Sequence, residues 1–134
     1  MSYKNDYNKV LLALVVWREA RGEIEAAKVG VAWTIRNRVM KPGWWGTSWI
    51  SVILKPFQFS SFNHSDPNAT KMPDEDDHSW DDSLNAAYSV YTLGVNDPTG
   101  GATHYFDKSL DSNPPSWAAE LSHKCDIGNL HFYG

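Results

Sequence analysis

The segment "VLLALVVWREARGE" at residues 10–23 constrains the fold of this chain more than any other. Its first eight residues are apolar, and most of those that follow are charged. The apolar run is shorter than the roughly 20 residues of a transmembrane helix, and no small-residue cleavage site of a signal peptide follows it. With the Asn-Asp pair at 5–6 as N-cap and Gly22 as stop, the pattern predicts a helix over residues 7–21. Because this helix is apolar on all sides for two turns, we expect it to be buried and central.

The length and charge of the chain limit its organisation and its partners. At 134 residues it is long enough for one domain with a real core, so we expect a single domain over residues 1–134, and we expect a monomer. The net charge is −4, which provides no basic surface for nucleic acid or for an anionic membrane. We therefore expect no nucleic-acid partner and no stable membrane insertion.

Two further helices follow from the pattern of apolar residues. Residues 25–40 contain several small residues, which predicts a helix that packs closely against a neighbour. Residues 81–93 have apolar side chains at helical spacing and precede Gly94, a natural stop. Between these helices, residues 43–64 read as irregular to strand-like, with "ISVIL" as a β-prone stretch, and residues 65–80 read as an acidic surface loop.

The last part of the chain contains an internal repeat. "GATHYF" at 101–106 and "GNLHFY" at 128–133 each place a histidine three residues after a glycine and two aromatic residues after that. The repeat predicts two short strands that lie near each other. A period of two puts Asn129, His131 and Tyr133 on one strand face, opposite Leu130 and Phe132. By the same period, Thr103 and Tyr105 are separated from His104 and Phe106. The fold class expected is therefore α+β, mainly helical, with a small β element.

Glu19 stands in the last turn of the first predicted helix. The carbonyl end of a helix disfavours an anion, the preceding apolar run desolvates the carboxylate, and Glu23 adds like charge four residues later. All three effects raise the pKa of a carboxyl group, while Arg18 and Arg21 point to other faces of the helix. Such a carboxylic acid is suited to general acid catalysis. The alternative is an ordinary solvated glutamate paired with arginine.

The histidines and the single cysteine suggest no cofactor. No two of the five histidines have i, i+4 spacing, and no H-E-x-x-H motif is present, so we expect neither a metal nor any other cofactor. A zinc amidase in which His104 and His131 converge stays open as an alternative. Cys125 is the only cysteine, so no disulfide can form within one chain. We favour a packing role for Cys125, as a small residue at the end of a secondary-structure element, over a role as a nucleophile. The seven tryptophans fit either core packing or a groove that stacks sugar rings.

Several motifs together resemble a known family. "WREARGE", "IRNRV", "FQFSSF", "DPTGGATHYF", "PSW" and "IGNLHFYG" stand in the order found in the cell-wall hydrolase family of SleB-type spore-cortex-lytic enzymes. The resemblance implies a lysozyme-like, mainly helical catalytic domain that cleaves the glycan strand of peptidoglycan. It matches Glu19 to the catalytic acid, and it matches nine further residues to the substrate groove: Gln58, Phe59, Ser60, Thr103, His104, Tyr105, Asn129, His131 and Tyr133.

The number of suitable carboxylates bears on the reaction. A hydrolytic muramidase usually needs two, and Glu23, Asp97 and Asp107 are the candidates for the second. Because Glu19 alone is well placed, a lytic transglycosylase is favoured, in which the 6-hydroxyl of N-acetylmuramic acid attacks C1. A zinc amidase and a non-catalytic wall-binding module remain as alternatives.

The expected site of action is the bacterial cell wall. No export signal is visible in the sequence. We therefore expect another route to the wall, such as release from the host cytoplasm as a phage lysin.

Overall fold

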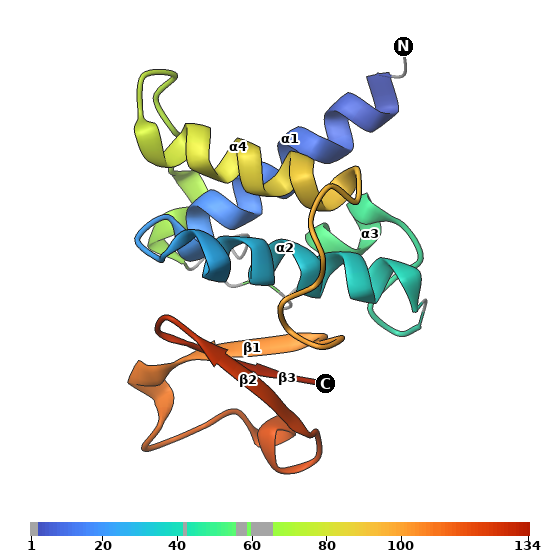
Figure 1. Cartoon of the computed structure of the whole chain (residues 1–134), viewed down its shortest axis with the longest axis vertical. Coiled ribbons are helices and arrows are strands. Elements are labelled where there is room, and N and C mark those ends of the chain that lie inside the picture. Colours follow the sequence, from blue (N-terminus) through green and yellow to red (C-terminus); the bar gives the residue numbers. More distant parts are fainter. Residues whose placement is uncertain (1–2, 42, 56–58, 60–65) are drawn as a thin grey trace.

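The structure, a computed structural model, describes residues 3–41, 43–55, 59 and 66–134. Within these residues it contains four α-helices, three short 3₁₀ helices and one three-stranded sheet (Figure 1). The α-helices are α1 (Tyr3–Ala20), α2 (Glu25–Met40), α3 (Trp49–Leu54) and α4 (His78–Tyr91). The strands are β1 (His104–Asp107), β2 (His123–Ile127) and β3 (Leu130–Tyr133), and the 3₁₀ helices are η2 (Pro67–Thr70), η3 (Lys108–Leu110) and η4 (Ser116–Ala119).

Helix α2 lies between the other helices and the sheet. It contacts α1, α3 and α4 as well as β1 and β2, and Figure 1 shows the sheet on the side of α2 away from α1 and α4. Gly30 of α2 lies against the ring of Phe132, so close that a Cβ atom there would be 2.7 Å from the ring. The prediction that this helix packs closely against a neighbour is confirmed, and the helix has the predicted bounds 25–40.

The predicted central helix is also confirmed. Leu12, Val15 and Val16 of α1 are fully buried and form part of the single core cluster of the described residues. The helix begins at Tyr3 rather than residue 7, so the Asn-Asp pair at 5–6 lies inside it and does not cap it. It ends at Ala20, two residues before Gly22. No helix in the described part of the chain is long and apolar enough to cross a membrane.

The sheet brings the two copies of the internal repeat together, as predicted. β1 and β3 are antiparallel neighbours, with His104 opposite Tyr133 and Phe106 opposite His131. β2 pairs with the other edge of β3, so the strand order is β1-β3-β2. The sequence does not predict β2, because "HKCDI" is short and mostly exposed and lacks the alternation of a half-buried strand.

Two other expectations are wrong in detail. "ISVIL" lies in α3 and is not a strand, because Ser48 and Ser51 form a reciprocal capping box that starts a helix there. Helix α4 begins at His78, where Asp77 caps it through the backbone N–H of Ser79, so it takes in the end of the predicted loop 65–80.

Candidate active site

A cavity of 470 Å³ opens beside the edge strand β1. We call it the Glu19 cavity, because Glu19 reaches it from the last turn of α1. Arg38 lines it from α2 and Leu130 from β3, and the rest of its wall comes from β1, from the segment that follows β1 and from the aromatic residues Trp44 and Phe59. Its lining residues are Glu19, Arg38, Trp44, Phe59, His104, Tyr105, Phe106, Asp107, Leu110, Pro115, Trp117 and Leu130.

The Glu19 carboxylate accepts a hydrogen bond in this cavity. The Tyr105 hydroxyl donates to Glu19 Oε1 at 2.9 Å, across 86 residues of sequence. Burial and the neighbouring Glu19 carboxylate raise the pKa of Tyr105 well above its usual value. Tyr105 therefore stays protonated and acts as a fixed donor toward Glu19. The raised pKa of Glu19 expected from the sequence stays a prediction.

The two arginines that flank Glu19 in the sequence contact another segment. Arg18 Nε donates to the carbonyl oxygen of Lys71 at 3.1 Å, and Arg21 donates to the side-chain oxygen of Asn68 at 3.0 Å. The guanidinium of Arg21 also stacks on Trp17, 4.5 Å from the ring centroid. These contacts tie the end of α1 to residues 66–72 and fix the position from which Glu19 projects.

Arg38 is a buried cation in the cavity wall that is not among the site residues predicted from the sequence. Its Nε donates to the carbonyl oxygen of Thr103 at 2.6 Å, and its guanidinium carbon lies 5.5 Å from the Trp45 ring centroid and 5.1 Å from that of Phe59. Burial lowers the pKa of Arg38 to about 10, so it remains charged at neutral pH. Its spacing in the sequence could have revealed it, because Arg38 follows the apolar Ile35 by three residues and therefore shares the buried face of α2.

His104 is held neutral in the cavity. Its Nδ1 lies 2.9 Å from the Thr103 hydroxyl, and its ring packs 4.7 Å from that of Trp117. Burial, with a smaller contribution from the Arg38 cation, lowers the pKa of His104 to about 4. Thr103 itself does not appear in the cavity wall, and it contributes by holding His104 and Arg38 in place.

Aromatic rings form much of the cavity surface. Trp44 stands 63% exposed at its mouth, while Trp117 packs against His104 and Phe106. Flat apolar rings of this kind stack on the faces of sugar rings. The question that the sequence left open is thus answered for two of the tryptophans, Trp44 and Trp117, which line the cavity.

Comparison with known proteins agrees with this architecture. A family model described as Cell Wall Hydrolase matches residues 22–133. The chain belongs to the cell wall hydrolase family. The family match begins three residues after Glu19 and does not include it, so the role of Glu19 as the catalytic acid stays a prediction.

Three relatives of this cell wall hydrolase are informative. A spore cortex-lytic enzyme of Halalkalibacterium halodurans is 31% identical over 115 residues, which is 85% of this chain and 31% of that protein. The chain thus spans about a third of the length of this curated relative. The catalytic domain of the germination-specific lytic transglycosylase SleB from Bacillus anthracis has a TM-score of 0.74 and 26% identity, covering 100% of this chain and 97% of that one. The catalytic domain of the Bacillus cereus SleB protein has a TM-score of 0.75 and 26% identity, covering 100% of this chain and 93% of that one. These matches confirm the resemblance and the mainly helical α+β fold.

The structure brings together only part of the predicted groove of this cell wall hydrolase. Glu19, Phe59, His104 and Tyr105 line the cavity. Gln58 and Ser60 lie outside the described residues.

Three residues of the predicted groove lie elsewhere. His131 and Tyr133 line a second, open hollow of 500 Å³, because alternate residues of β3 face opposite sides of the sheet. Asn129 instead holds Glu23, through its backbone N–H at 2.9 Å and its side-chain amide at 3.1 Å. His131 and Tyr133 share one strand face, as predicted, whereas Asn129 lies in the turn before β3 and its side chain contacts Glu23.

The candidates for a second carboxylate are separated in space. Glu23 is bound to Asn129, and Asp97 accepts hydrogen bonds from Thr99 and Gly101 in the turn before β1. Asp107 lines the Glu19 cavity and caps η3 through the backbone N–H of Ser109. Of the three candidates, Asp107 is therefore the one that shares the cavity with Glu19.

Cys125 has the surroundings of a packed residue. Its thiol lies 3.7 Å from the carbonyl oxygen of Pro98. Burial, together with nearby aspartates, raises the pKa of Cys125 above its usual value. A thiol that is hard to deprotonate is a poor nucleophile, which agrees with the interpretation favoured from the sequence.

Proposed function

We propose that this cell wall hydrolase cleaves the glycan strand of peptidoglycan as a lytic transglycosylase, between N-acetylmuramic acid and N-acetylglucosamine. The observation that carries the proposal is the Glu19 carboxylate in an aromatic cavity, where it accepts a hydrogen bond from the Tyr105 hydroxyl. The name of the Bacillus anthracis relative, a lytic transglycosylase, supports the same reaction.

In this mechanism Glu19 acts first as an acid and then as a base. Its carboxyl group gives a proton to the glycosidic oxygen as the bond from C1 to that oxygen breaks. The resulting carboxylate then takes the proton of the 6-hydroxyl of N-acetylmuramic acid, whose oxygen bonds to C1. The product ends in a 1,6-anhydro sugar, no water is consumed, and a single carboxyl group serves both steps.

The neighbouring residues support these two steps. Tyr105 holds one oxygen of Glu19 in place and stabilises the carboxylate formed after the first proton transfer. Arg38 lies buried beside the same cavity and favours negative charge in it. Trp44 and Trp117 line the cavity and offer stacking surfaces for sugar rings of the substrate.

The position of Asp107 in the Glu19 cavity favours a second candidate function, that of a hydrolytic muramidase. A hydrolysing glycosidase uses a second carboxylate as nucleophile or as the base that activates water, and Asp107 lines the cavity with Glu19. In that reaction the product would have a reducing end rather than an anhydro end.

Mass analysis of fragments from purified peptidoglycan tests the proposal. We expect fragments with anhydro ends, one water lighter than hydrolysed ends, from the wild-type protein and from Asp107→Asn. We expect no fragments from Glu19→Gln, and near wild-type amounts from the matched variant Glu23→Gln. Loss of activity in Asp107→Asn, with reducing ends in the wild type, would establish the muramidase instead. If Glu23→Gln were the inactive variant, the wrong glutamate would have been assigned.

The remaining parts of the proposal concern assembly and delivery. We also propose that the chain acts on the wall as a monomer. Size-exclusion chromatography with light scattering checks this. The curated relative is named for the spore cortex, so release as a phage lysin gains no support from it.

A further inference from the structure

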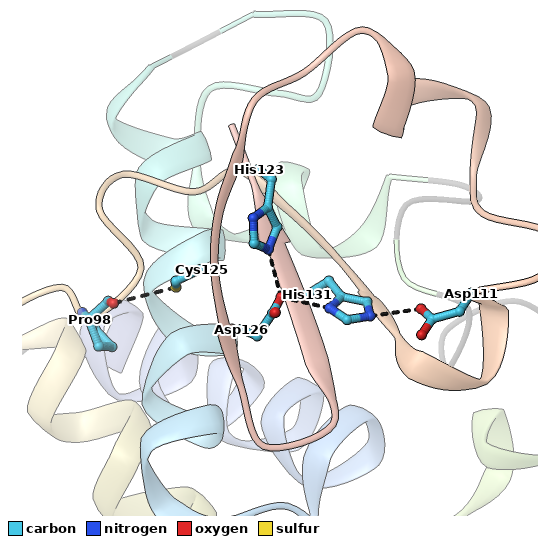
Figure 2. Close-up of polar contacts among 6 residues, drawn as sticks. All are labelled: Pro98, Asp111, His123, Cys125, Asp126 and His131. Atoms are coloured by element: carbon cyan, nitrogen blue, oxygen red, sulfur yellow. Dashed lines mark hydrogen bonds and ion pairs between the residues drawn. The ribbon is translucent and has the colours of Figure 1, made fainter.

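A cluster of histidine and aspartate side chains lies at the second hollow, on the sheet face opposite the core. His123 Nε2 and His131 Nδ1 lie 2.6 and 2.7 Å from the same carboxylate oxygen of Asp126. The other nitrogen of His131, Nε2, lies 2.7 Å from a carboxylate oxygen of Asp111. Figure 2 shows the two imidazole rings converging on Asp126, with Asp111 on the far side of His131.

The backbone of β2 is shaped so that these side chains can meet. In a regular strand, residues three apart point to opposite faces, yet His123 and Asp126 are three apart and both line the hollow. The register between β2 and β3 shifts between His123 and Cys125, as in a β-bulge. This irregularity turns His123 to the face on which Asp126 and His131 stand opposite each other in the ladder.

The side chains of His123, Asp126 and His131 form a ligand set for a metal ion. One ring nitrogen from each histidine and one oxygen of Asp126 all lie within 4.8 Å of one another. Two imidazoles and a carboxylate are typical ligands of Zn²⁺ and related first-row divalent ions. An ion would replace the protons that now link the two rings to Asp126. Since Asp126 is half-exposed, rotation of its side chain can make room for an ion about 2 Å from each ligand atom.

Asp111 has the position of a supporting residue. A histidine that binds a metal through one ring nitrogen commonly donates its other N–H to a carboxylate, which fixes the tautomer and the ring orientation. Asp111 Oδ1 accepts from His131 Nε2 in this way, which leaves Nδ1 directed at the ligand set. All four residues line the same 500 Å³ hollow, so the ion would be reachable from solvent and would keep water in its remaining positions.

We propose that His123, Asp126 and His131 bind one divalent transition-metal ion, with Zn²⁺ as the first choice and Asp111 as the residue that orients His131. The site joins β2 and β3 to the segment that carries Asp111, immediately after η3. The elements directly before Asp111 contribute Asp107, at the end of β1, and Leu110, at the end of η3, to the Glu19 cavity. The ion therefore stabilises a wall of the cavity and takes no part in bond cleavage, and the inference does not depend on the proposed function.

Zinc binding to the intact chain tests this proposal without any assay of activity. The protein is freed of metal with EDTA, desalted and titrated with ZnCl₂ in a calorimeter. We expect one Zn²⁺ per chain and a higher melting temperature with zinc. His131→Gln and Asp126→Asn should lose at least tenfold in zinc affinity, and Asp111→Asn should lose about tenfold. His78→Gln, which changes an exposed histidine at the start of α4, is the matched control and should bind as the wild type does.

Equal zinc affinity in His131→Gln and His78→Gln, or no uptake of zinc by the wild type, would overturn the proposal. Circular dichroism verifies that each variant is folded. If the site variants do not fold, histidine ring signals of the wild-type protein in NMR spectra give the answer. Zinc should then shift the signals of His123 and His131 and leave that of His78 unchanged, and the opposite pattern would refute the site.

Discussion

At the scale of single residues, the contact between Tyr105 and Glu19 controls the proposed chemistry. A hydrogen bond to a carboxylate favours its ionised form, so Tyr105→Phe leaves Glu19 easier to protonate. We expect the basic limb of the pH profile of kcat/KM to move to higher pH, because the general acid keeps its proton longer. We also expect peak activity to fall roughly tenfold, as the loss of about 1.4 kcal/mol of transition-state stabilisation would give. Turbidity clearing of cell walls across pH measures both effects, and an unchanged profile would show that Tyr105 has only a packing role.

The lowered pKa of His104 predicts how the stability of the protein depends on pH. Its pKa is about 4 in the native protein against an ordinary 6.5, so the unfolded chain binds a proton that the native protein does not. Stability should therefore decrease as the pH falls from about 6.5 to about 4, by at most about 3 kcal/mol. Thermal melts at pH 7 and pH 4.5 check this. The difference between the two melting temperatures should be smaller for His104→Gln than for the wild type, and an equal difference would mean that other groups cause the acid sensitivity.

At the scale of secondary-structure elements, the site depends on the close approach of α2 to the sheet. A Cβ atom at Gly30 would lie 2.7 Å from the Phe132 ring and 3.2 Å from Thr99. Phe132 is fully buried and stands opposite Tyr105 in the sheet. Any shift of its ring that makes room for a methyl group therefore moves the donor to Glu19.

We therefore expect Gly30→Ala to lower both stability and activity. The cost of overpacking, about 1–3 kcal/mol, exceeds the gain in helix propensity of about 1 kcal/mol. Gly22→Ala is the matched control, because a Cβ atom there meets nothing within 4 Å, and it should behave as the wild type does. Melting temperature and wall clearing are measured for both variants. A Gly30→Ala protein as stable as the control would show that β3 can move away from α2 without cost.

At the scale of the whole molecule, we propose different roles for the two hollows: the Glu19 cavity carries out the reaction, and the metal site in the second hollow stabilises the fold. The reaction proposed for the Glu19 cavity needs only proton transfers from the protein. The His123–Asp126–His131 cluster, where we propose the metal ion, lies on the outer face of the sheet. We expect EDTA to leave wall cleavage largely unchanged while it lowers the melting temperature of zinc-loaded protein. Loss of activity that zinc restores, with free amino groups among the products, would indicate an amidase instead.

The sequence by itself determined the parts of this protein that depend on local pattern. The apolar run before Glu19 predicted a buried helix with that residue in its last turn, and small residues predicted the tight packing of residues 25–40. The repeat of "GATHYF" and "GNLHFY" predicted two neighbouring strands. Helical and strand periods, helix-stop residues and repeats all act over a few residues, so a single chain reveals them.

Only the tertiary structure decided which side chains meet. Tyr105 reaches Glu19 across 86 residues and Arg38 reaches Thr103 across 65, and no local pattern encodes such pairs. Strand alternation separates the faces of β3, but the packing of that strand on α2 decides which face is buried, so His131 faces the outer hollow. The irregular register of β2 then turns His123 toward His131. It arises from pairing between strands, so it exists only in the assembled sheet.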